Sequence, residues 1–101
     1  MEFSEVLTAV REWLAHVPMP TQIQRDTNAG LWAYIETENA LAELIVGKDD
    51  CAPWRFVSMT VLDTRLEPQA GPVFTLWGRE EHTIPDILRA LDLGMEMIGA
   101  L

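Results

Sequence analysis

The side chains of this sequence that could take part in metal or acid–base chemistry are few, and their spacing fits no common site. The only histidines are His16 and His82, and His82 directly follows Glu80 and Glu81. Adjacent side chains do not converge on one point in either a helix or a strand. The usual zinc-ligand spacings and glycine-rich phosphate loops are absent. We therefore predict neither a metal site nor a cofactor.

Two carboxylates and one thiol are the other candidates for catalysis. Glu36 and Glu38 lie two residues apart, so on a strand their side chains share a face at a separation of about 7 Å. Such a pair can act as general acid and general base, but the same spacing is typical of an exposed strand face. Cys51 follows two aspartates, whose charges disfavour the thiolate that a nucleophile needs. We assign no catalytic residue.

The aromatic residues give a clearer lead. The chain has four tryptophans, at positions 13, 32, 54 and 77. Tryptophan serves both core packing and binding surfaces, because it offers a large contact area for little loss of conformational entropy. Trp32 and Tyr34 share a strand face with Glu36, and an aromatic wall beside a carboxylate can hold an organic cation. We predict a ligand- or partner-binding surface made of Trp32, Tyr34, Trp54, Glu36 and Glu38.

The charge balance points to the kind of partner. Asp and Glu number 16 against 7 Lys and Arg, which gives a formal net charge of −9. This excess argues against binding to nucleic acid or to an anionic membrane surface, since both depend on Lys and Arg. It favours a basic protein partner, and the acidic segments 36–50 and 80–96 are the predicted contacts.

Hydrophobic periodicity predicts a helix at each end of the chain. Apolar residues recur at helical spacing over 3–17, and Pro18 ends this segment. The second helix covers 83–100, with Thr83 as N-cap, Pro85 in the first turn and Asp86 completing a capping box. Gly94 is expected to bend or end it. The apolar arc of this helix is wide, which indicates burial on two sides.

The middle of the chain is rich in strands. Alternation and composition predict strands at 21–25, with Ile23 inward, and at 31–36, 54–62 and 73–77, the last two as an antiparallel hairpin. Residues 37–47 fit either a helix from Thr37 to Gly47 or a strand, and the run Leu44-Ile45-Val46 favours the strand. Strand 54–62 carries apolar residues on both sides, so we expect it to be covered twice, or covered once and paired with another molecule.

These elements describe one α+β domain over residues 1–101. We expect an antiparallel sheet of about four strands, with the N-terminal and C-terminal helices packed on one face. The 49% of hydrophobic residues supply a core. The single cysteine and the absence of a signal-peptide pattern predict a cytoplasmic protein. The wide arc of helix 83–100 and the two-sided strand 54–62 predict a homodimer.

Three functions remain open from the sequence. The first is a non-catalytic acidic binding module that engages a basic protein partner, as inhibitor or immunity proteins do. The second is a small-molecule binding domain, for a cationic or apolar ligand, with a pocket lined by Trp32, Tyr34 and Trp54 between sheet and helix. The third is a small enzyme that uses Glu36, Glu81 or His82.

Overall fold

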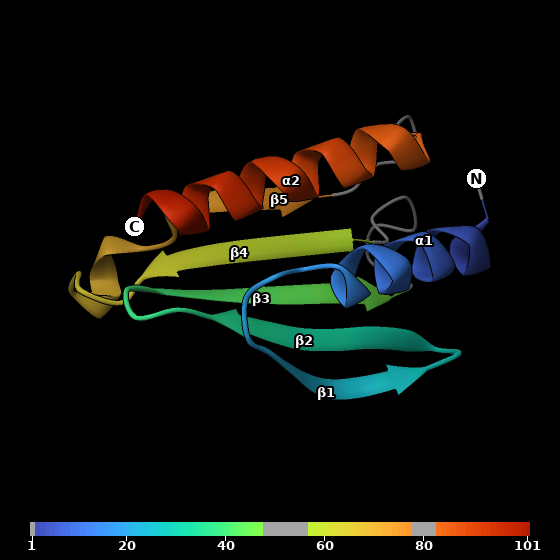
Figure 1. Ribbon diagram of the computed structural model, residues 1–101, viewed down its shortest axis with the longest axis horizontal. Helices are drawn as coiled ribbons and strands as arrows, with labels where there is room; N and C mark the ends of the chain where they lie inside the picture. The colour runs from blue at the N-terminus through green and yellow to red at the C-terminus, as the bar shows by residue number, and fades with distance from the viewer. Residues whose placement is uncertain (1, 48–56, 78–82) are drawn as a thin grey trace.

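The computed structural model describes residues 2–47, 57–77 and 83–101. An N-terminal helix is followed by five strands and a C-terminal helix (Figure 1). The elements are α1 (Phe3–Ala15), β1 (Thr21–Thr27), β2 (Gly30–Glu36), β3 (Ala40–Gly47), β4 (Val57–Asp63), a 3₁₀ turn at Pro68–Ala70, β5 (Phe74–Trp77) and α2 (Ile84–Ala100). The predicted α+β class is confirmed, and the sheet has five strands where about four were expected.

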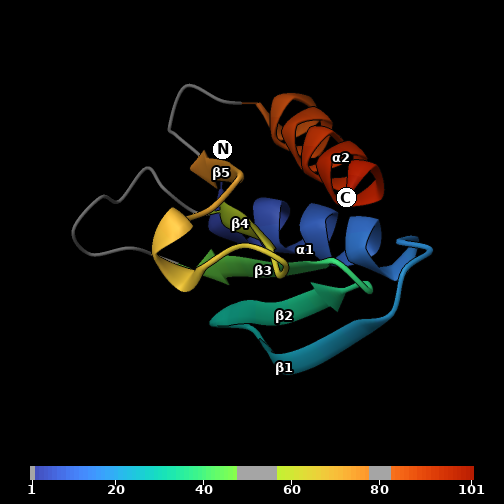
Figure 2. The ribbon, with the colours of Figure 1, turned by 90° about the vertical axis from the view of Figure 1, so that its left-hand side faces the viewer.

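All five strands form one antiparallel sheet in sequence order, β1-β2-β3-β4-β5. Both helices cover the same face of it, α1 over β2 and β3 and α2 over β4 and β5 (Figure 2). In the part of the chain that the structure describes, no helix covers the opposite face of the sheet. No described helix is both long and apolar enough to cross a membrane.

The core lies between the sheet and the two helices. Strand side chains alternate between faces, and β3 shows this most clearly, with Ala40, Ala42, Leu44 and Val46 all buried. This period of two confirms the strand reading of the segment. The other buried residues are Val6, Leu7, Val10, Leu14, Leu31, Ala33, Ile35, Val57, Met59, Val61, Ile87, Leu91 and Ile98, and none of the buried residues in the described chain is polar.

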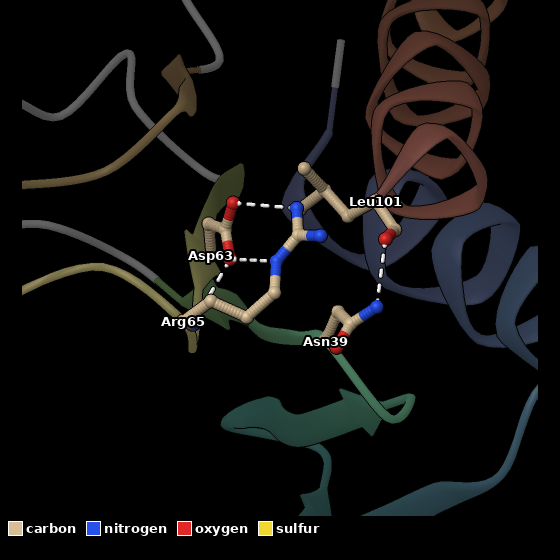
Figure 3. Close-up of polar contacts among 4 residues, drawn as sticks. All are labelled: Asn39, Asp63, Arg65 and Leu101. Atoms are coloured by element: carbon tan, nitrogen blue, oxygen red, sulfur yellow. Dashed lines mark hydrogen bonds and ion pairs between the residues drawn. The ribbon is translucent and has the colours of Figure 1, made fainter.

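Local hydrogen bonds fix where α2 begins and ends. The Thr83 hydroxyl accepts from the Asp86 backbone N–H, and the Asp86 carboxylate accepts from the Thr83 backbone N–H, so the predicted capping box is confirmed. At the other end, the Asn39 side-chain amide donates to the Leu101 carbonyl at 2.9 Å (Figure 3). This bond ties the end of α2 to the β2–β3 turn.

Gly94 does not end the second helix, because α2 continues through it to Ala100, so this part of the prediction was wrong. Gly94 is buried where α2 crosses the sheet. A Cβ atom there would lie 2.6 Å from the Met59 sulfur and 3.1 Å from a ring carbon of Phe74. The glycine therefore serves the close approach of helix and sheet rather than a break in the helix.

The structure corrects the prediction for Ile23 and narrows the alternatives for the strand at 54–62. Ile23 pairs with Ala33 and so lies on the helix-facing side, yet it is 56% exposed. β1 is an edge strand, which α1 reaches through the Arg11–Asp26 ion pair but which leaves Ile23 exposed, and its pairing with β2 is irregular between Ile23 and Arg25. β4 is covered on one face only, since Val57, Met59 and Val61 are buried while Leu62 is 39% exposed on the other. The N-terminal part of the predicted strand, residues 54–56, lies outside the described residues.

Candidate binding surfaces

A groove runs between α1 and α2 on the outer side of the helix layer. It encloses a cavity of about 690 Å³. We call it the interhelical groove. Its apolar lining consists of Trp13, Val17, Pro18, Met19, Leu88 and Met95. Trp13, Val17, Met19, Leu88 and Met95 are partly buried against the core, so the floor of the groove is continuous with the folded interior.

Carboxylates stand on both walls of the interhelical groove. Glu12 belongs to α1, and Asp92 and Glu96 lie one helical turn apart on α2. Asp92 accepts a hydrogen bond from the Trp13 indole N–H at 2.8 Å, which joins the two helices. The side chains of Glu12 and Glu96 form no hydrogen bond or ion pair with any residue that the structure describes. Three negative charges therefore surround an apolar floor.

One histidine lies at the end of the groove. His16 caps the C-terminus of α1, and its Nδ1 lies 2.8 Å from the Glu12 backbone carbonyl. Since a carbonyl only accepts, Nδ1 donates in this contact. Among the described residues that line the groove there is no Lys or Arg to pair with its acids.

The open face of the sheet carries a second cluster, of aromatic side chains around Glu43. The indole N–H of Trp32 and the hydroxyl of Tyr34 both donate to Glu43 Oε2, each at 3.1 Å. The two rings are tilted by 59°, with centroids 5.8 Å apart. Partial burial raises the pKa of the Tyr34 hydroxyl, and its hydrogen bond to the Glu43 carboxylate adds to the shift. Ile45 pairs with Trp32 across the strands and is 41% exposed.

The structure places the predicted surface residues as follows. Trp32, Tyr34 and Glu36 alternate along β2 and share the open face, as predicted. Their side chains point away from both helices, so they do not line a pocket between sheet and helix. The alternate residues of β2, Leu31, Ala33 and Ile35, face the helices and are buried in the core. Glu36 and Glu38 border a shallower hollow of about 560 Å³ near the β2–β3 turn. Trp54 lies outside the described residues.

The catalytic candidates receive no added support. Cys51, Glu80, Glu81 and His82 lie outside the described residues. Within residues 2–47, 57–77 and 83–101, no group of three or more His, Cys, Asp or Glu side chains could hold a metal ion.

The interhelical groove was missed from the sequence. Its two hydrogen-bonded residues, Trp13 and Asp92, are 79 residues apart in the sequence and lie on different helices. One signal was present: a tryptophan at the margin of an apolar stripe needs an acceptor for its N–H. Glu43 shares the open face with Leu41 and Ile45 in the strand reading, but nothing in the sequence pairs it with Trp32.

Comparison with known proteins adds no relative. No family model, curated protein or solved structure that was compared with the chain matches it. The function must therefore be argued from the geometry above.

Proposed function

We propose that this protein is a binding module that engages a basic protein partner through the interhelical groove. The observation that carries the proposal is the combination of an apolar floor with carboxylates on both walls and no Lys or Arg among the described lining residues. The floor supplies the free energy of apolar burial, at roughly 25 cal/mol per Å². The carboxylates steer a cationic partner and select against acidic ones.

The net charge of −9 acts in the same direction. Three of the arginines that the structure describes already have carboxylate partners within this chain: Arg11 with Asp26, Arg65 with Asp63 and Arg89 with Asp86. Glu12 and Glu96 have none among the described residues. An external Lys or Arg therefore gains a new ion pair there without displacing an existing one.

Removing the charges of the groove tests this function. The triple variant E12Q/D92N/E96Q keeps the side-chain volumes, and the amide oxygen at position 92 can still accept the hydrogen bond from the Trp13 indole N–H. Proteins captured by the wild type at low salt are identified, and the basic ones are purified and titrated. We expect at least tenfold weaker binding to the triple variant, and weaker binding to the wild type in 0.5 M salt, because salt screens exposed charges.

A matched control separates the groove from bulk charge. The variant E2Q/E5Q/E67Q removes the same number of charges from sites outside the groove and outside the predicted acidic contacts, while its amide oxygens can still accept the capping bonds of α1. It should bind like the wild type apart from a small change in association rate. Equal loss in the two variants, or captured partners that are not basic, would contradict the proposal.

A further inference from the structure

We infer that the segment of the partner held by the interhelical groove is an amphipathic α-helix with basic residues on both sides of its apolar stripe. This inference rests on the proposed function and adds the conformation and pattern of the ligand. Its basis is the shape and the hydrogen-bonding capacity of the groove.

The lining residues of each wall recur at helical spacing. Ala9, Glu12, Trp13 and His16 follow one side of α1. Leu88, Asp92, Met95 and Glu96 follow one side of α2. At 1.5 Å per residue these stretches are about 10–12 Å long, or roughly two helical turns. The groove is thus a straight channel between two helices. An amphipathic helix of the partner would match it, because such a helix presents apolar side chains at i, i+3, i+4 and i+7 along one side.

Hydrogen bonding argues against an extended segment. A strand needs partners for its backbone N–H and C=O groups, and burying these groups unpaired costs several kcal/mol. The backbone groups of α1 and α2 are used within the helices, and the edges of the sheet are elsewhere. The polar side chains of the groove are Glu12, His16, Asp92 and Glu96, which are mostly acceptors.

Donors are therefore scarce for the carbonyl groups of a strand. The Trp13 N–H is already donated to Asp92, and His16 Nδ1 faces the Glu12 carbonyl. A helix satisfies its own backbone and needs only side-chain contacts, so it is the conformation that this groove can bury at least cost.

The positions of the charges give the pattern of the ligand. Glu12 stands on the α1 wall, while Asp92 and Glu96 stand on the α2 wall. A helix seated over Trp13, Leu88 and Met95 would meet carboxylates on either side of its apolar stripe. Lys and Arg at those flanking positions can lay their methylene stems on the apolar rim while the charged heads reach the acids.

Two synthetic peptides test the inference. Both have 14 residues and the same Leu and Lys content, one with helical periodicity and one with strict alternation. We expect the helical pattern to bind at least tenfold tighter by calorimetry. We also expect its helix content, followed by isotope-edited NMR, to rise on binding. The variant E12Q/D92N/E96Q should weaken this binding, whereas E2Q/E5Q/E67Q should not.

The outcomes separate the two claims. If the alternating peptide binds as tightly as the helical one, and only the groove variant weakens it, the helical ligand is wrong and the binding function stands. If neither peptide binds, or both charge variants bind alike, the proposed function fails and the inference with it. If added peptide instead dissociates a dimer of the protein, measured by sedimentation, the groove belongs to a second copy and the inference is overturned.

Discussion

At the scale of single residues, aromatic donors hold several of the surface carboxylates in place. Trp13 donates to Asp92, and Trp32 and Tyr34 both donate to Glu43. These donors are neutral, so each carboxylate keeps its full negative charge while its orientation is fixed. Arginine pairing, by contrast, cancels the charge of Asp26, Asp63 and Asp86. The Trp13–Asp92 bond thus fixes the orientation of one of the three carboxylates that line the interhelical groove.

The pairing of Asp63 with Arg65 gives a prediction for acid stability. The side-chain hydrogen bonds from the Arg65 guanidinium, followed by the bond from its backbone N–H, lower the pKa of the Asp63 carboxyl (Figure 3). Because the folded pKa lies below the unfolded one, this stabilisation is complete above the unfolded pKa of about 3.9 and is lost as pH falls through the folded pKa.

We therefore expect Asp63→Asn to lower the free energy of unfolding at pH 7 more than at pH 2, measured by urea denaturation. Glu67→Gln, which removes a carboxylate with no bond to a described side chain, should show no such difference. An Asp63→Asn effect that is the same at both pH values would contradict this assignment.

At the scale of elements, Gly94 decides how closely α2 approaches the sheet. Its missing side chain leaves room for Met59 and Phe74. Alanine is the better helix former by about 1 kcal/mol, yet its Cβ would displace the fully buried Met59, and overpacking of this kind typically costs about 1–3 kcal/mol. We expect Gly94→Ala to lower the midpoint of thermal unfolding.

The matched control for this prediction lies on the same helix. A Cβ at Gly99 meets nothing within 4 Å. Gly99→Ala should therefore leave the midpoint unchanged or raise it slightly through helix propensity. If both variants raise the midpoint equally, Gly94 is not a packing residue.

Local sequence was sufficient to predict both helices and the capping box at Thr83. Residues 37–47 fitted a helix or a strand, and only the strand propensity of Leu44-Ile45-Val46 favoured the strand that the structure shows at Ala40–Gly47. Local sequence could not predict features that depend on tertiary position. Ile23 alternates like a buried residue, but only the order of the strands shows that it lies at an edge. Trp13 and Asp92 become partners only because α1 and α2 pack side by side, so the candidate site between them could not be derived from either helix alone.

At the scale of the whole molecule, the two candidate surfaces lie on opposite sides of the sheet. The interhelical groove is lined by α1 and α2, which form the helix layer (Figure 2). The open face exposes Trp32, Ile45 and Leu62. We place the predicted homodimer on this open face, since no element among the described residues covers its exposed apolar side chains, and such patches mark association surfaces.

Net charge makes this dimer distinguishable from binding of a basic partner. Two copies with a charge of −9 each repel one another, and each brings Glu36 and Glu43 to the open face. Raising the salt from 0.05 to 0.5 M shortens the Debye length from roughly 14 to 4 Å. Dimerisation should therefore tighten with salt, while binding of a basic partner at the groove should weaken.

Sedimentation equilibrium at the two salt concentrations measures the dimerisation, and the Trp32→Ser variant should dimerise more weakly than the wild type. A monomer at high micromolar concentration in 0.5 M salt would show that the open face does not associate with itself.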